Sequence, residues 1–160
     1  MEPAEAKRIL HQAMGNAAFR TRLYDSKYRI DRDFDIPYLA GYSKDGRVIY
    51  VDRHLPIQLL IGGRRIAILP YLTTHERTEK ALLDFFDFKY TKAHQVATFA
   101  EHKELQSQNI SPNLYEKALD PYIKADQVEK ITRVPLDLDM EPYRDSRDLR
   151  LLSRMKDMMV

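Results

Sequence analysis

The sequence predicts an α+β fold in which a small antiparallel sheet packs with a helical C-terminal half. Two turn signals, Lys44-Asp45-Gly46 and Gly62-Gly63, divide residues 37–69 into short apolar runs that fit a β-meander. Helical periodicity dominates before and after this section. A length of 160 residues, with 44% hydrophobic and 31% charged residues, fits one domain spanning residues 1–160 with one sizeable core.

The composition narrows the classes of function. Lys and Arg number 26 and Asp and Glu number 24, so the net charge of +2 gives no strong signal for nucleic-acid binding. Because the chain has no cysteine, a metal site would have to use His, Asp and Glu. No apolar run approaches the roughly 20 residues that span a bilayer, and residues 1–10 are too charged for a signal peptide. We therefore expect a cytoplasmic protein without a membrane partner.

The N-terminal half should contain one helix and the sheet. Residues 3–23 are predicted to be helical, because proline suits the first turn and apolar residues then recur at helical spacing. Residues 25–36 are polar and aperiodic, which predicts a loop. Three or four antiparallel strands are expected, at Tyr38–Tyr42, Val48–Val51, Ile57–Ile61 and Ile66–Leu69. Pro70 should close the sheet, because proline cannot donate to a strand ladder.

The C-terminal half should be mostly helical. A first helix is predicted over about 71–86, capped by Thr73 or Thr74. Further elements follow at these approximate positions: helices at 91–108 and 112–130, an extended segment at 133–143, and a terminal helix at 144–158. Two helices joined by a short break pack antiparallel, so we expect the first two to lie side by side.

The helix predicted over 71–86 carries polar residues where its apolar stripe should continue. The apolar stripe of this helix runs through Leu72, Leu83 and Phe86, with Leu82 beside it. At about 100° per residue, Glu79 falls near the centre of that stripe, and His75 and Glu76 lie on either side of it. A buried carboxylate is costly unless it is paired, hydrogen-bonded or bound to a metal. The helix therefore needs a polar partner.

The second of these helices offers a metal ligand. Zinc peptidases place two histidines one turn apart, in H-E-x-x-H, so that both face one ion. Here the first is His75, and the fifth position holds Glu79, whose carboxylate can also bind zinc. We predict that His94 completes a zinc site with them, and that Glu76 is the general base that activates water. Glu101 would support a ligand from behind or serve as an alternative ligand.

This arrangement resembles the zincin-like metallopeptidases, in particular the compact bacterial and phage group of ImmA/IrrE type. The segment His94-Gln95-Val96-Ala97-Thr98-Phe99-Ala100 is similar to that group's ligand-bearing helix, with His94 in place of the acidic ligand. The resemblance covers roughly residues 47–102, and it also extends to uncharacterised phage and prophage proteins that share the patterns PYL..HE..EKAL, AHQ.A...E and P.DLD..PY. It implies a zincin-like fold and a zinc-dependent hydrolase of metallopeptidase type that acts on a protein or peptide.

Two simpler interpretations of the polar face remain open. Glu79 could be buried against an arginine, for which Arg53, Arg64 and Arg65 are the candidates. The face could instead be solvated, with ordinary pairs one turn apart, such as Glu76 with Lys80, which contribute only a few tenths of a kcal/mol. The alternative function is a non-enzymatic, phage-related binding or structural protein in which a buried His/Glu network fixes the helix pair.

Other polar residues favour structural roles. Asp137 and Asp139 could chelate a hard cation, but they alternate with Leu and Met, which predicts an extended strip with its acids outward. Of the remaining histidines, His54 should lie in a loop, His102 on an exposed helix face and His11 in the first helix.

Overall fold

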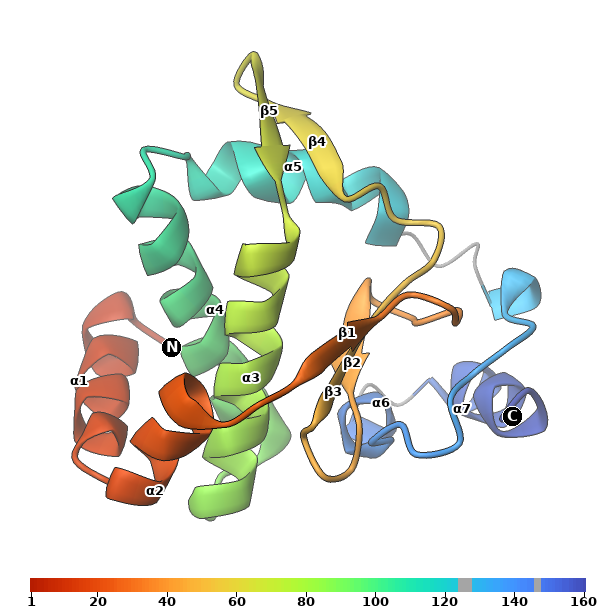
Figure 1. The fold of residues 1–160 in the computed structure, drawn as a ribbon, viewed down its shortest axis with the longest axis horizontal. Helices are drawn as coiled ribbons and strands as arrows, with labels where there is room; N and C mark the ends of the chain where they lie inside the picture. The colour runs from red at the N-terminus through yellow and green to blue at the C-terminus, as the bar shows by residue number, and fades with distance from the viewer. Residues whose placement is uncertain (124–127, 146–147) are drawn as a thin grey trace.

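The computed structural model describes residues 1–123, 128–145 and 148–160, and it confirms the α+β class (Figure 1). The helices are α1 (Pro3–Met14), α2 (Ala17–Arg20), a π-helical turn (Thr21–Asp25), α3 (Leu69–Phe85), α4 (Tyr90–Ser107), α5 (Pro112–Ile123), a 3₁₀ turn (Val128–Lys130), α6 (Glu141–Asp145) and α7 (Leu149–Asp157). The strands are β1 (Arg29–Asp31), β2 (Ala40–Tyr42), β3 (Val48–Val51), β4 (Gln58–Ile61) and β5 (Arg64–Ala67). No helix of the described residues is long and apolar enough to cross a membrane.

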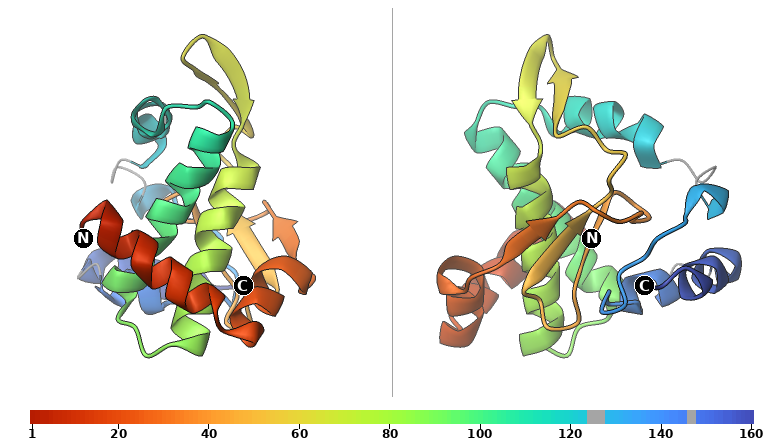
Figure 2. Two further views of the ribbon diagram at one scale, coloured as in Figure 1. Left: turned by 90° about the vertical axis from the view of Figure 1, so that its left-hand side faces the viewer. Right: turned by 45° about the vertical axis from the view of Figure 1, so that its right-hand side comes forward.

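Helices α3 and α4 form the centre of the helical layer. A short connection makes them an antiparallel pair, and α1 packs against the outer side of α4 (Figures 1 and 2). Small residues let the helices approach closely, since Ala81, Ala93 and Ala97 are fully buried. The larger side chains Phe19 and Leu82 fill the space between them. This packing fixes the relative positions of α3 and α4, which carry the polar residues singled out above.

The main sheet has the strand order β1-β3-β2. Strand β2 pairs antiparallel with β3, as expected, and Gly46 in their turn has a φ of 71°, which glycine adopts without a Cβ penalty. The prediction of a purely antiparallel sheet is wrong, because β1 pairs parallel with β3. Strand β1 lies inside the predicted loop at 25–36, and its side chains are mostly exposed. Backbone pairing with β3 holds it, so no apolar alternation marks it in the sequence.

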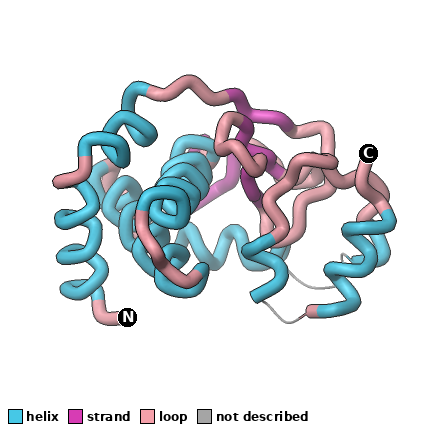
Figure 3. The backbone as a smooth tube through the Cα atoms, turned by 90° about the horizontal axis from the view of Figure 1, so that it is seen from below, coloured by secondary structure: helices cyan, strands magenta, loops and turns pink. Residues whose placement is uncertain are grey.

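Strand β3 is buried on both faces, which divides the fold into three layers. Ile49 and Val51 face a core shared with α3, while Val48 and Tyr50 face a second core formed with the C-terminal segment. Strands covered on both sides read as continuous apolar runs, which explains the sequence of Val48–Val51. Seen from below, the helices and the C-terminal elements lie on opposite sides of the strands (Figure 3).

Strands β4 and β5 form a separate hairpin that projects from the body (Figures 1 and 2). Ile61 pairs with Arg64, so the connecting loop is the predicted Gly62-Gly63. Both glycines have positive φ, 56° and 79°, as the favoured two-residue hairpin turn requires. The single meander expected over 37–69 is therefore two units, because residues 52–57 leave the main sheet before β4 begins.

The C-terminal segment, residues 131–140, runs as an irregular strip across the sheet. Its backbone bonds to the strands: the Asp139 amide donates to the Tyr42 carbonyl at 2.9 Å, and the Lys44 amide donates to the Asp137 carbonyl at 2.8 Å. Leu138 and Met140 are buried, as the alternation predicted, but Leu136 is exposed. The extended segment ends before 143, because α6 begins at Glu141.

Several helix boundaries differ from the predictions. The helix expected over 3–23 breaks at Gly15 and resumes after Asn16, whose side chain caps α2 by accepting from the Phe19 amide. Helix α3 begins at Leu69 with Pro70 in its first turn, where proline is well tolerated. The hydroxyls of Thr73 and Thr74 therefore do not cap the helix but donate to carbonyls of its first turn.

Two predicted helices extend over residues that lie outside the described part of the chain. The helix expected over 112–130 is confirmed as α5 to Ile123 and is followed by the 3₁₀ turn that begins at Val128, while residues 124–127 lie outside the described residues. The terminal helix expected over 144–158 corresponds to the end of α6 and to α7, while residues 146–147 are likewise outside.

Candidate metal centre

Helix α3 is buried on most of its circumference, and this places its polar residues inside the protein. His75, Glu76 and Glu79 are all less than a tenth exposed, with Glu79 at only 2%. Thr78 and Lys80 on other sides of the helix are buried as well, because α3 lies between the sheet, α4 and the N-terminal helices. The expectation that Glu79 points inward is confirmed, and the solvated-face interpretation is wrong.

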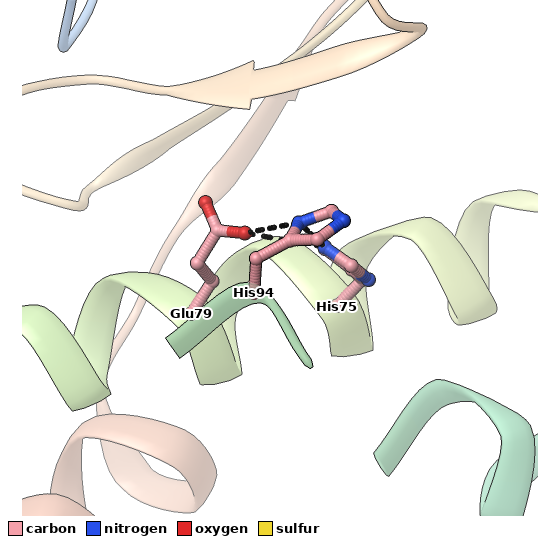
Figure 4. A group of neighbouring side chains, drawn as sticks. All are labelled: His75, Glu79 and His94. Carbon is pink, nitrogen blue, oxygen red and sulfur yellow. Dashed lines mark hydrogen bonds and ion pairs between the residues drawn. The ribbon is translucent and has the colours of Figure 1, made fainter. Parts of the chain in front are cut away.

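Three side chains from α3 and α4 converge at one point (Figure 4). We call His75, Glu79 and His94 the His/Glu trio. Nε2 of His75 lies 3.3 Å from Oε2 of Glu79 and 3.1 Å from Nδ1 of His94, and the same Nδ1 and Oε2 are 2.8 Å apart. In a tetrahedral zinc site with metal–ligand distances of about 2.0–2.1 Å, two ligand atoms are separated by about 3.3 Å. The spacing within the trio is therefore close to that of three zinc ligands.

Hydrogen bonds with residues outside the trio fix the orientations of His75 and Glu79. Nδ1 of His75, the nitrogen that faces away from the trio, lies 3.0 Å from Oε2 of Glu101. The Tyr115 hydroxyl donates to the other oxygen of Glu101, and the Tyr42 hydroxyl donates to Oε1 of Glu79, both at 2.8 Å. Glu101 therefore fixes the orientation of the His75 ring through Nδ1, so that Nε2 can act as a ligand. This geometry favours the supporting role expected for Glu101 over the ligand role.

The pKa values of His75 and Glu79 are shifted in opposite directions. Burial disfavours the charged form of His75, but hydrogen bonds to Glu101 and Glu79 outweigh it and raise the pKa of the imidazole well above its ordinary value. Burial likewise disfavours ionised Glu79, yet hydrogen bonds from His75 and His94 lower its pKa to about 2. The raised pKa of His75 and the lowered pKa of Glu79 both favour an ion pair between these two side chains.

Glu76 differs from the other carboxylates of the site. It is 8% exposed, and among the described residues it has no hydrogen-bond partner. Burial, and then the neighbouring charge of Glu79, raise its pKa to about 8. Glu76 and the His/Glu trio line one cavity of about 660 Å³, which we call the metal-side pocket. His94 has 47% of its side chain exposed and opens the trio to this pocket.

The other candidate residues lie elsewhere. The arginine alternative for Glu79 is wrong, because Arg53 pairs with Asp35, and Arg64 donates to the Asn109 carbonyl. Arg65 on β5 is exposed. The remaining histidines are positioned as expected: His54 is in a loop beside Asp35, His102 pairs with Glu116 on the surface and His11 is in α1. The carboxylates of Asp137 and Asp139 accept from Tyr50 and Lys80 respectively. This pairing fits the structural role expected for both.

Sequence reasoning missed the tyrosines that support the site. Tyr42 comes from β2 and Tyr115 from α5, far from α3 in the sequence. Tyr90, the first residue of α4, places its hydroxyl 3.4 Å from Nδ1 of His94. The chain has 10 tyrosines spread along its length, so none stands out by pattern. Only the position of Tyr42 in a predicted strand before a turn could have marked it as inward-facing.

Comparisons with protein-family models, with curated proteins and with solved structures found no match to this chain. The chemistry of the residues is therefore the basis on which a function can be inferred.

Proposed function

We propose that this protein is a zinc-dependent hydrolase of metallopeptidase type. The His/Glu trio would bind the ion, and Glu76 would act as the general base on a zinc-bound water. A centre with two His and one Glu leaves a fourth position for that water, as catalytic zinc sites do. The observation that carries the proposal is the convergence of three ligand atoms within 4.8 Å of one another, next to a buried carboxylate that lines the same pocket.

The support behind the ligands favours a metal over a purely structural network. Metal-binding histidines commonly donate their second ring nitrogen to a carboxylate, which fixes the tautomer and increases the basicity of the ligand nitrogen. His75 has this arrangement with Glu101, and Tyr115 in turn orients Glu101. Glu79 has one oxygen held by Tyr42 and the other directed at the two histidines. Each protein ligand on α3 is thus held in position by a partner outside the trio.

The environment of Glu76 suits a general base. A general base must be accessible from the space in which the substrate binds. Its carboxylate must also not already accept a hydrogen bond from another group. Glu76 lines the metal-side pocket, and no described residue donates to it. A cation bound by the trio would favour its ionised form, because opposite charge lowers the pKa of a carboxylate.

The sheet offers a place for an extended peptide. Strand β3 lies between β1 and β2, so only the outer strands can accept a further strand. Ala40 and Gly41 of β2 line the metal-side pocket. The carbonyl of Tyr42 accepts from the Asp139 amide, whereas the Ala40 carbonyl has only a long contact, 3.5 Å, with the Tyr143 hydroxyl, so a peptide strand would replace that contact at Ala40. A protein or peptide substrate would pair there, with its backbone beside the trio.

A non-enzymatic binding or structural protein is the second candidate. The charges in the site favour this candidate, because a charged His75 and a charged Glu79 compensate each other without a metal ion. In that case the trio would serve to fix α3 against α4.

The substitution Glu76→Gln separates the two candidates. We expect the zinc-loaded variant to keep its metal and its fold and to lose about 10²–10⁴-fold in peptide hydrolysis, because general base catalysis contributes about that much. The measurement is hydrolysis of a denatured carrier protein, followed by mass spectrometry, together with metal analysis of the same samples.

Glu104→Gln is the matched control, because Glu104 is exposed on α4 and outside the metal-side pocket. Equal hydrolysis by the wild type and Glu76→Gln, or a wild type that binds zinc and cleaves nothing, would favour the second candidate.

A further inference from the structure

A second cavity, of about 450 Å³, lies beside the metal-side pocket. We call it the side pocket. Tyr38 and Ile123 contribute to the walls of both cavities, so the two share a boundary. Tyr38 is half exposed, so its ring is accessible from the space that the two cavities share. The side pocket is therefore adjacent to the space in which a substrate of the proposed reaction would lie.

The wall of the side pocket is mainly apolar. It is formed by Ile36 and Pro37 before β2, by Ile131 in the C-terminal segment and by Leu151 in α7. Its two buried acids already have partners, since Asp35 accepts from Arg53 and Thr132, and Asp52 accepts from the Ile36 and His54 amides. Because both carboxylates are satisfied, the buried part of the pocket offers apolar surface to an occupant, and its one lysine, Lys130, is exposed. A large aliphatic or aromatic side chain is the chemistry that fits.

The boundary between the two cavities has an unusual backbone. Tyr38 and Leu39 have φ values of 57° and 79°, the left-handed region that residues with a Cβ rarely enter. Both residues are therefore strained, and such conformations cluster at functional sites. The Tyr38 ring lies parallel to the Tyr143 ring, with centroids 6.3 Å apart. The strained turn therefore presents the Tyr38 ring at the entrance between the two cavities.

We propose that the side pocket binds a large apolar side chain of the peptide substrate, at a residue near the bond that is cleaved. This inference rests on the proposed function, since it takes the peptide bond to lie at the His/Glu trio. Tyr38 is the specificity-determining residue, because its ring separates the reaction space from the side pocket. The enzyme then prefers peptides with leucine or phenylalanine at that position over peptides with glycine.

The test uses acetylated peptide hydroxamates that differ in one side chain only: glycine, leucine or phenylalanine. The hydroxamate binds zinc and anchors each peptide at the trio. Titration calorimetry with zinc-loaded protein should give dissociation constants at least tenfold lower for leucine and phenylalanine than for glycine, because an apolar pocket discriminates by about 10- to 200-fold per group. Ile123→Trp, which would fill the shared boundary, should remove this difference. Leu136→Trp is the control, because Leu136 is exposed and outside both pockets.

The outcomes separate this inference from the proposed function on which it rests. Equal affinities for the three hydroxamates, or a preference that survives in Ile123→Trp, would overturn the assignment of the side pocket and leave the metal centre intact. Zinc-loaded protein that binds none of the hydroxamates would also overturn it. Protein that takes up no zinc, measured in the same samples, would overturn the metal centre and this inference with it.

Discussion

Glu79 holds the site together because its two carboxylate oxygens have different partners. Oε1 accepts from the Tyr42 hydroxyl, and Oε2 faces both histidines of the trio. A carboxylate with 2% exposure is stable only with such partners, since an unpaired buried charge costs several kcal/mol. The residue that interrupts the apolar face of α3 therefore links the sheet, α3 and α4.

At the residue scale, Glu101→Gln tests whether the contact behind His75 tunes a metal site. A neutral amide supports the imidazole less well than a carboxylate, so we expect zinc affinity to fall by about 10- to 100-fold. The measurement is competition for zinc with a chromophoric chelator at constant pH. Glu104→Gln on the same helix should leave the affinity unchanged. A wild-type affinity in Glu101→Gln would show that the contact has no influence on the metal.

The trio and Glu101 could be predicted from the sequence, whereas the tyrosines that support them could not. Helical spacing places Glu79 inside an apolar face, and the short connection to α4 brings His94 opposite it. Tyr42 and Tyr115 reach the site through the tertiary fold, so no local spacing connects them with α3. Helical periodicity also predicts that Leu83 lies on the buried face. In the structure Leu82 is the fully buried residue, because α3 is covered on most sides.

At the scale of elements, the Asp35 cluster connects the strands to the C-terminal segment. Asp35 precedes β2, and its carboxylate accepts from Arg53 after β3 and from Thr132 and Arg133 in the C-terminal segment. The Asp35 amide also donates to the Arg133 carbonyl at 2.8 Å. This cluster fixes one end of the C-terminal segment, which covers the second face of β3.

We expect Asp35→Asn to lower the free energy of unfolding by about 1.5–3 kcal/mol, because hydrogen bonds to a charged group contribute about that much. The measurement is urea unfolding, followed by circular dichroism. Asp33→Asn is the control, because Asp33 is exposed two residues away. If the two variants were equally stable, the cluster would not carry the stability assigned to it.

The same variant has a defined pH dependence. Burial opposes ionisation of Asp35, but the bonds from Thr132 and Arg53 outweigh it and lower its pKa. A lowered pKa contributes stability above the unfolded value of about 3.9, and this contribution is lost as the pH falls through the lower folded value. The stability difference between the wild type and Asp35→Asn should therefore be constant above about pH 5 and shrink below about pH 4. A difference that grew on acidification would contradict this assignment.

Elements held by backbone pairing were the hardest to predict. Strand β1 has an exposed, charged sequence and exists because β3 offers a free edge. The parallel pairing is invisible to local patterns, whereas the Gly62-Gly63 hairpin is specified by its own turn residues. Helices α3 and α4 were predicted to within a few residues, because long periodic segments carry the strongest signal.

At the scale of the whole molecule, the candidate site depends on several elements at once. The metal-side pocket is lined from β2, α3, α4, α5 and α6, which are brought together only by the complete three-layer packing. A cation at the trio would bind the folded state and not the unfolded chain, so its binding free energy adds to stability. We expect zinc at 100 times its dissociation constant to raise the stability by about 2.7 kcal/mol, which corresponds to a rise in Tm of about 5–10 °C.

Differential scanning calorimetry with and without a chelator measures this shift. The His75→Ala variant should show no zinc-dependent rise, whereas His102→Ala, on the surface of α4, should show the full rise. An equal rise in both variants would place the stabilising ion elsewhere.

The most direct test of the metal centre is the zinc content of protein purified without a histidine tag. Mass spectrometric metal analysis should find about one zinc ion per chain in the wild type and in His102→Ala, and much less than one in His75→Ala, Glu79→Ala and His94→Ala. Zinc content that is absent from the wild type, or that is unchanged in the three trio variants, would contradict the assignment of the His/Glu trio as a metal centre.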